Sequence, residues 1–215
     1  MNGYDDSDYA GESYDEAYDQ EIHGDMSLDF GAQAYTDAMN TKDPGERNRL
    51  FQQAAHWYEK SAGFGNAQAA TNLGYVYLYG RIGMVDDSKA FSWFTRGAEL
   101  GNEESCYKLG DLYRAGRGCA RDYDAAFRLY CKAERIAAQT CDPYEPQNQA
   151  VLASIDLRLA GHWEHVAGDD ARRTAHRYYA SAVERFADAV DGGLHWYAKT
   201  LDSAKAGADR TAEAR

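Results

Sequence analysis

The feature that most constrains this chain is a repeat with a period of 36 residues. The stretch GNAQAATNLGYVYLYG, residues 65–80, shares its skeleton with GNEESCYKLGDLYRAG, residues 101–116. When residues 54–80 are aligned with 90–116 without a gap, nine of 27 positions are identical. Self-similarity at a period of about 20 to 50 residues is typical of stacked supersecondary units. The chain is therefore expected to fold as a stack of such units.

Each repeat predicts a pair of helices. Leu73, Val76 and Tyr77 recur at helical spacing, and Gly80 follows where a left-handed residue suits a C-cap. Second helices are expected to begin at aspartates, which are good N-caps. The predicted helices are 28–41, 45–62, 67–79, 86–99, 103–115, 122–138, 148–161 and 171–190, with a last helix over 193–208 that caps the open end of the array. The predicted fold class is all-α.

Small residues and large aromatics alternate in a way that suggests how the helices pack. Gly74 and Gly110 would let two antiparallel helices approach closely, and aromatic rings would fill the space between successive pairs. Gly65-Asn66 and Gly101-Asn102 are expected to form the tight link from one pair to the next.

The pattern A-x-x-W-Y/F-x-x-x-A, G-N, L-G-x-x-Y-x-x-G and D-x-x-x-A, over residues 54–133, resembles the Sel-one-like repeat. This repeat is a 36-residue relative of the tetratricopeptide repeat. The resemblance implies a right-handed α-solenoid of antiparallel helix pairs that acts as a non-enzymatic adaptor, with no shared catalytic residues. Some secreted members have regularly paired cysteines. The four cysteines of this chain lack that pairing, which favours the cytoplasm.

The solenoid expectation also indicates a binding surface. In such stacks the first helix of each pair lines the concave face, where a protein or peptide partner could bind. Side chains on that face that the core does not need could hold the partner, or they could be ordinary solvated positions. The predicted partner-binding residues are Gln68, Asn72, Tyr75, Tyr79, Glu104, Lys108, Asp111 and Arg114.

The N-terminal segment has a composition of its own. Residues 1–30 hold ten acidic residues and no Lys or Arg. Residues 1–26 are predicted to be a disordered acidic tail, because they have too few aliphatic side chains to offset the entropy of ordering, and residues 27–210 are predicted to form the repeat domain. Four tyrosines recur among the acids. The tail could simply solvate the protein, or it could be a ligand or autoinhibitor that docks on a cationic, aromatic-lined groove, which would make the chain a regulatory protein.

Charge and hydropathy exclude some partners. The formal net charge is −12, and the acidity lies mainly in the first 30 residues. Neither the acidic segment nor the rest of the chain has the clustered cations that binding to nucleic acid requires. No run of about 18 apolar residues is present that could span a membrane. The chain begins MNGYDDSDYA, which is not a secretory signal, so a cytoplasmic location is expected. No cofactor is predicted, and the oligomeric state stays open.

Two segments offer residue types that can support chemistry. GHWEHVAGDD, residues 161–170, contains His162, Glu164 and His165, but these follow the predicted helix end at Gly161, so a polar loop is favoured over a metal site. Cys119 follows Arg117 and precedes Arg121, which could lower its thiol pKa. It has no evident resolving partner. A metal- or thiol-dependent enzyme is therefore the least favoured function.

A basic cluster lies on one predicted helix. It is either a solvated face or an acceptor for an acidic ligand, the tail included. Its members are Arg172, Arg173, His176, Arg177 and Arg185.

Overall fold

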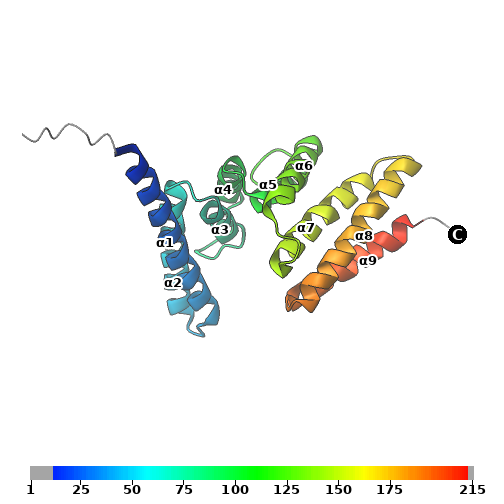
Figure 1. Cartoon of the computed structure of the whole chain (residues 1–215). Helices are drawn as coiled ribbons and strands as arrows, with labels where there is room; N and C mark the ends of the chain where they lie inside the picture. The colour runs from blue at the N-terminus through cyan, green and yellow to red at the C-terminus, as the bar shows by residue number, and fades with distance from the viewer. Residues whose placement is uncertain (1–11, 213–215) are drawn as a thin grey trace, which may run out of the picture. The chain divides into compact units, whose positions relative to one another are not determined.

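The computed structural model describes residues 12–212, with side chains from residue 23 onward. Every regular element in this range is helical, as predicted (Figure 1). None of these helices has an apolar stretch of the length needed to span a bilayer. The helices are α1 (Glu12–Asn40), α2 (Pro44–Gly63), α3 (Ala67–Leu78), α4 (Asp87–Glu99), α5 (Glu103–Ala115), α6 (Tyr123–Thr140), α7 (Pro146–Trp163), α8 (Asp169–Asp191), the 3₁₀ turn η1 (His195–Tyr197) and α9 (Ala198–Thr211).

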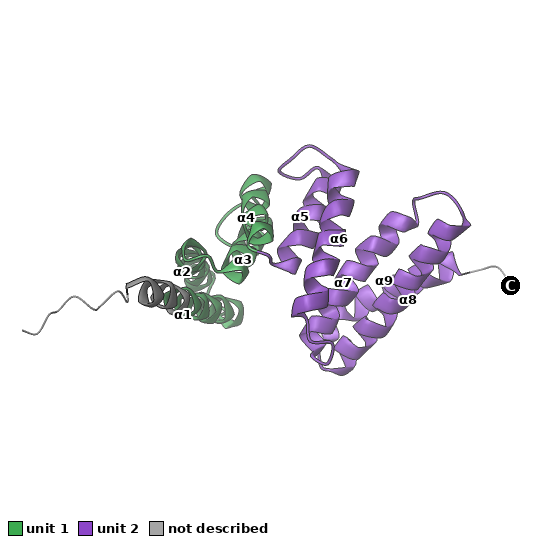
Figure 2. Cartoon of the chain, turned by 45° about the horizontal axis from the view of Figure 1, so that its top comes forward, with its two compact units in different colours: residues 1–100 green, residues 101–215 purple. Residues whose placement is uncertain are grey.

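The chain divides into two compact units, residues 1–100 and 101–215 (Figure 2). In the first unit α1 packs on α2, α2 on α3, and α3 on α4. In the second unit the same order holds from α5 to α9. Packing of each helix mainly on its neighbours in sequence is the arrangement of a solenoid, in which stability comes from within repeats and between adjacent ones.

The repeated caps explain why the helices begin where they do. Asn66 and Asn102 each accept a hydrogen bond from the backbone amide three residues later, at 2.9 and 2.7 Å. Asp86 and Asp122 do the same at the starts of α4 and α6, at 2.9 and 2.8 Å. Each cap satisfies a backbone donor that the first helical turn leaves without a partner. The predicted bounds of α2 to α8 agree with the structure to within two residues at each end.

The first helix extends further towards the N-terminus than the sequence predicted. Of the segment 1–26 predicted to be disordered, residues 1–11 lie outside the described residues, and the remainder belongs to α1. The Ser61 hydroxyl donates to the Gly24 carbonyl at 2.7 Å, and the Asn66 amide donates to the Asp25 carboxylate at 3.0 Å. These contacts with the end of α2 and the α2–α3 loop provide the partners that the acidic composition alone does not suggest.

Two further differences lie near the C-terminus. Helix α7 continues past Gly161 to Trp163, because the ring of His162 stacks on Phe127 of α6 with centroids 3.8 Å apart. The last helix was expected to begin at residue 193. It is instead preceded by η1, where the Tyr197 ring stacks on Phe186 of α8 at 5.5 Å.

A glycine of one helix packs against an aromatic ring of a neighbouring helix in several pairs. A Cβ added at Gly74 would lie 2.6, 2.7 and 2.7 Å from three ring atoms of Phe94. Real Cβ atoms do not approach that closely, so the ring occupies the space that a side chain would need. The rings of all these pairs are buried. The pairs are Gly31 with Tyr58, Gly74 with Phe94, Gly110 with Tyr130, and Gly207 with Tyr179.

We expect Gly74→Ala to lower the free energy of unfolding by about 1–3 kcal/mol, because the added methyl group must displace the buried Phe94 ring. Gly63→Ala is the matched control, since nothing lies within 4 Å of its Cβ position. Alanine there should leave stability unchanged or raise it by at most about 1 kcal/mol. Urea unfolding followed by circular dichroism measures both. Equal stabilities for the two variants would contradict the close contact.

Candidate functional site

The predicted partner-binding residues divide between the two units. Gln68, Asn72 and Tyr75 lie on α3, with Tyr79 at its C-cap. Glu104, Lys108, Asp111 and Arg114 lie on α5. The structure thus brings each set of four together along one helix. The two sets belong to separate compact units.

In the first unit, the predicted residues form a ladder of amides and tyrosines along α3. The Gln68 amide donates to Asn72 at 3.1 Å, and the ring of Tyr75 stacks on Tyr79 with centroids 5.7 Å apart. Tyr75 also meets the buried Phe94 edge-on at 5.4 Å. Tyr79 is 54% exposed and carries the Arg81 guanidinium over its ring at 5.6 Å. Tyr79 is therefore an exposed aromatic ring that Tyr75 and Arg81 hold in place.

In the second unit, Asp111 lies at the centre of a network between three helices. Arg158 of α7 donates from Nε to Oδ1 at 2.8 Å and from Nη2 to Oδ2 at 2.5 Å. The Tyr130 hydroxyl of α6 donates to Oδ1 at 3.0 Å. Burial and the Asp111 carboxylate raise the pKa of Tyr130, so the phenol keeps its proton. The carboxylate of Asp111, one of the predicted partner-binding residues, is thus engaged within the fold.

The other side chains of this network also have contacts within the fold. The Arg158 guanidinium lies 4.3 Å from the centroid of the Tyr107 ring, and the Tyr107 hydroxyl donates to Glu104 at 2.8 Å. Burial and the charge of Arg158 lower the pKa of Lys108. Burial alone would lower the pKa of Arg158, but Asp111 more than offsets it and raises that pKa. Of the predicted set on α5, Arg114 is the side chain that remains exposed.

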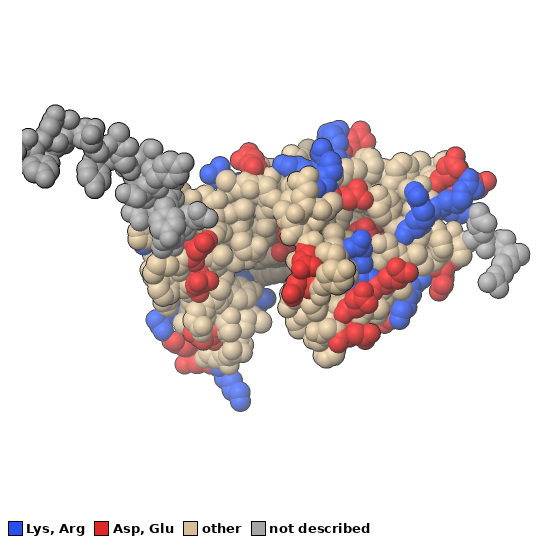
Figure 3. Space-filling view, viewed as in Figure 1, with Lys and Arg blue, Asp and Glu red and all other residues tan. Residues whose placement is uncertain are grey.

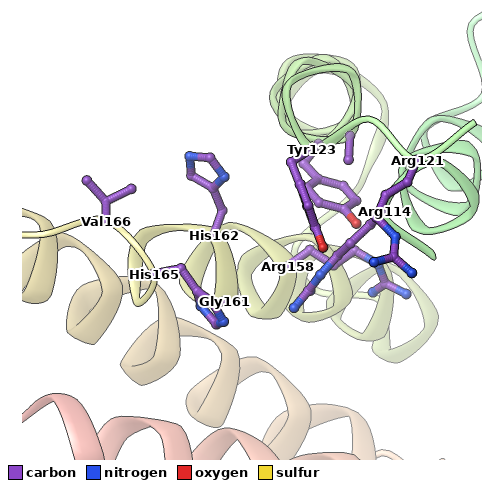
Figure 4. Close-up of a pocket in the computed structure, with 10 residues that line it drawn as sticks. Arg114, Arg121, Tyr123, Arg158, Gly161, His162, His165 and Val166 are labelled. Atoms are coloured by element: carbon purple, nitrogen blue, oxygen red, sulfur yellow. The ribbon is translucent and has the colours of Figure 1, made fainter. Parts of the chain in front are cut away.

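Arg114 lines a pocket of about 530 Å³ that is formed by α5, α6, α7 and the α5–α6 and α7–α8 loops. In Figure 4 the side chains of Arg114, Arg121 and Arg158 gather at one end, whereas His162 and His165 lie at the other. None of the lining residues is acidic. The lining residues are Arg114, Arg121, Tyr123, Ala126, Tyr130, Arg158, Gly161, His162, His165 and Val166.

The arginines of this pocket differ in their surroundings. Asp111 neutralises Arg158, with side-chain exposures of 18% for the arginine and 35% for the aspartate. Arg114 and Arg121 are exposed, and among the described side chains neither has an ion-pair partner. Two exposed guanidiniums in a cavity that Tyr123 and Tyr130 also line favour an anionic ligand. The sequence alone does not predict this pocket, because neither Arg121 nor Arg158 lies on the same predicted helix as Arg114.

The residues that suggested a metal site have other partners. Glu164 accepts from the Tyr179 hydroxyl at 2.5 Å and from Arg210 Nε at 2.8 Å, and these bonds lower its pKa. His162 stacks on Phe127, and burial lowers its pKa. Among the residues the structure describes, no group of three or more His, Cys, Asp or Glu could hold a metal ion.

The thiol expectation is corrected. Arg117 and Arg121 were expected to lower the pKa of Cys119, but burial and the Asp122 carboxylate raise it. All four cysteines are free thiols. A raised pKa leaves less of the reactive thiolate at neutral pH, so Cys119 has no activating environment.

The basic cluster on α8 is also partly tied into the fold. Arg185 pairs with Asp156 at 3.1 Å, and Ser181 donates to the same carboxylate at 2.7 Å. Arg173 pairs with Asp170, and Nδ1 of His176 lies 3.1 Å from the Ala208 carbonyl oxygen. Figure 3 shows acidic and basic side chains interspersed over the visible face of the second unit. The basic side chains of α8 are therefore a weaker acceptor for an anionic ligand than the pocket beside α5.

Consecutive helix pairs, a repeated Asn or Asp cap and rings packed on glycines define a helical repeat protein of the solenoid class. The model of the Sel1 repeat matches residues 44–63, 67–102 and 103–135. This part of the chain therefore belongs to the Sel1-like repeat family, whose members generally act as protein-interaction scaffolds. The family resemblance drawn from residues 54–133 is confirmed.

Several solved structures are similar to this chain, whereas no curated protein matches significantly. A Sel1 repeat protein from Oxalobacter formigenes is 29% identical over 59% of this chain and 92% of its own, with a TM-score of 0.41. Cysteine-rich protein B from Helicobacter pylori is 18% identical over 57% of this chain and 92% of its own, with a TM-score of 0.42. The c5321 protective antigen of uropathogenic Escherichia coli, which displays an SLR fold, is 18% identical over 93% of this chain and 64% of its own, with a TM-score of 0.38.

We expect Asp111→Ala to lower the free energy of unfolding by about 2–4 kcal/mol, because it leaves the partly buried Arg158 guanidinium without its carboxylate. Adding Arg158→Met to this variant should recover part of the loss, since the uncompensated charge is removed. Glu184→Ala on the exposed side of α8 is the control and should change stability by less than about 0.5 kcal/mol. Chemical denaturation measures all three, and a double variant less stable than Asp111→Ala alone would contradict the assignment.

Proposed function

We propose that this chain is a non-enzymatic scaffold that binds a segment of a partner protein. The observation that carries the proposal is the pocket beside α5, which Arg114 and Arg121 line together with the aromatic side chains of Tyr123 and Tyr130. Neither arginine has an ion-pair partner among the described side chains. Preformed pockets with a few convergent polar groups are the usual sites of recognition. The family of residues 44–135, whose members generally bind proteins, supports the same function.

The proposed mechanism is recognition of a carboxylate-bearing segment by charge-assisted hydrogen bonds. Arg114 and Arg121 would each bind a carboxylate, and Tyr123, which is 59% exposed, would contact an apolar part of the segment. Arg158 would stay on Asp111 and keep the floor of the pocket rigid. Little rearrangement is needed for this binding, which limits its entropic cost.

A second contact on the first unit follows from the tyrosine ladder. Tyr79 is exposed, yet its ring is stacked on Tyr75 and covered by Arg81. Tyrosine and arginine are enriched among binding hot spots, because they bury a large area with little loss of side-chain freedom. We propose that this ladder contacts the same partner or another one, as an anchor of the scaffold's first unit.

The test is affinity capture from a lysate of the source cells with full-length baits, read by mass spectrometry. The baits are the unaltered chain, Arg114→Gln with Arg121→Gln, Tyr75→Ala with Tyr79→Ala, and the control Arg128→Gln with Arg135→Gln on α6 outside the pocket. We expect the pocket variant to recover a specific partner about tenfold less well than the unaltered chain. The control should recover it fully. Equal recovery by every bait would contradict the proposal.

A further inference from the structure

The pocket beside α5 carries more positive charge than the side chains around it balance. Of its three arginines, Arg158 is neutralised by Asp111 and also donates from Nη1 to the Ser154 carbonyl at 2.6 Å. Arg114 and Arg121 have no ion-pair partner among the described side chains, and none of the described residues that line the cavity is acidic. The pocket therefore suits an anion that can contact both of these guanidiniums.

The arginines lie at the same end of the cavity. Figure 4 shows the side chains of Arg114, Arg121 and Arg158 gathered there. A Cβ added at Gly161 would lie 3.7 Å from Nη1 of Arg114, so this guanidinium reaches from α5 to the backbone of α7. Guanidiniums that gather in this way match a single anion with several oxygens, because one group can then accept hydrogen bonds from both exposed arginines.

The acidic residues closest to the pocket in sequence do not neutralise the two exposed arginines. Asp122 accepts a hydrogen bond from the Ala125 amide at 2.8 Å and thereby caps α6. Asp124 is exposed in the first turn of the same helix. In the part of the chain that the structure describes, neither carboxylate forms an ion pair with Arg114 or Arg121. The positive charge is thus left for an outside ligand.

The rest of the cavity is lined by rings and apolar groups. Tyr123, Tyr130 and His162 line it together with Ala126 and Val166. Its volume of about 530 Å³ is larger than an isolated anionic group would fill, and it lies in the ordinary range for ligand pockets. An aromatic ring that carries an anionic group would match both parts of the cavity, through ring contacts at one part and charge-assisted hydrogen bonds at the other.

We propose that the pocket beside α5 binds a phosphorylated tyrosine side chain of a partner protein, with the phosphate on Arg114 and Arg121 and the ring beside Tyr123. This inference rests on the proposed function, because it names the group of the partner that the same pocket would recognise. A phosphate carries a charge of about −1.5 to −2 at pH 7 and has three acceptor oxygens, whereas a carboxylate has a single charge and two. Phosphorylation of the partner would therefore strengthen the binding that a carboxylate-bearing segment provides.

The test titrates N-acetyl-O-phosphotyrosine amide into the full-length chain at low salt and follows the backbone amide resonance of Gly161 by NMR. We expect saturable shifts and a dissociation constant that rises about tenfold or more in Arg114→Gln with Arg121→Gln. Arg128→Gln with Arg135→Gln on α6 outside the pocket is the matched control and should bind the probe unchanged. Both pocket arginines are exposed, so their replacement should leave the fold intact, and circular dichroism checks this.

Comparison probes separate the phosphate from the ring that carries it. Inorganic phosphate lacks the ring and N-acetyltyrosine amide lacks the phosphate, so each should bind about tenfold more weakly than the phosphotyrosine probe. Adenosine 5′-monophosphate, in which a ribose separates the ring from the phosphate, should also bind more weakly. Tyr123→Ala should weaken binding of the phosphotyrosine probe and leave that of inorganic phosphate unchanged.

The inference is overturned if the phosphotyrosine probe does not bind, or if it binds the variant with both pocket arginines replaced as tightly as the control. It is also overturned if inorganic phosphate or adenosine 5′-monophosphate binds as tightly, since the pocket would then be a site for a free anion or a nucleotide. Partner capture that depends on Arg114 and Arg121 while the probe fails to bind would sink this inference and keep the proposed function. Binding of the probe at these arginines, with capture that does not depend on them, would overturn the proposed function and keep the ligand assigned to the pocket.

Discussion

The contact of an aromatic ring with a glycine on the preceding helix is the constraint on which the rest of the structure depends. Phe94 covers Gly74, and Tyr130 covers Gly110, each within one helix pair. Both partners recur after 36 residues, so the same contact is built twice by the repeat. The ring takes the space of a Cβ. Moving the two helices apart would therefore open a cavity, and sliding one along the other would cause a steric clash, and both are costly.

The same contact links packing to the candidate site. The ring of Tyr130 lies on Gly110 and its hydroxyl donates to Asp111, the next residue of α5. Asp111 in turn holds Arg158 of α7. The packing of one helix pair thereby positions the first helix of the next, and it sets the floor of the pocket in which Arg114 and Arg121 remain available.

Local features of the fold could be predicted from the sequence because they depend on short-range chemistry. The glycine at position 110 lets two helices approach closely, as expected. The asparagine at position 102 lies in the expected link between helix pairs, where it also caps α5. The start of α1 could not be predicted, because Gly24 and Asp25 are held by Ser61 and Asn66, far along the chain. Acidic composition contains no information on such contacts.

The candidate site was predicted only in part, for a related reason. Arg114 was placed correctly on α5, but the role of Asp111 depends on Arg158, which follows an insertion that hides the repeat frame. A signal was present: Arg158 precedes Gly161 by three residues, as Tyr113 precedes Gly116. Arg158 therefore occupies the position of the repeat tyrosine, and its guanidinium pairs with the Asp111 carboxylate within the fold.

The most direct test of the ring-on-glycine contact is the proton NMR spectrum of the glycine α-protons. The nearly equal distances from the Gly74 Cβ position to three consecutive ring atoms place it over the face of Phe94. We expect the α-proton that points in the Cβ direction of Gly74, and that of Gly110, to be shifted strongly upfield by the ring currents of Phe94 and Tyr130. Gly63, with nothing within 4 Å of its Cβ position, should resonate at the ordinary glycine position. Ordinary shifts for all three glycines would contradict the account.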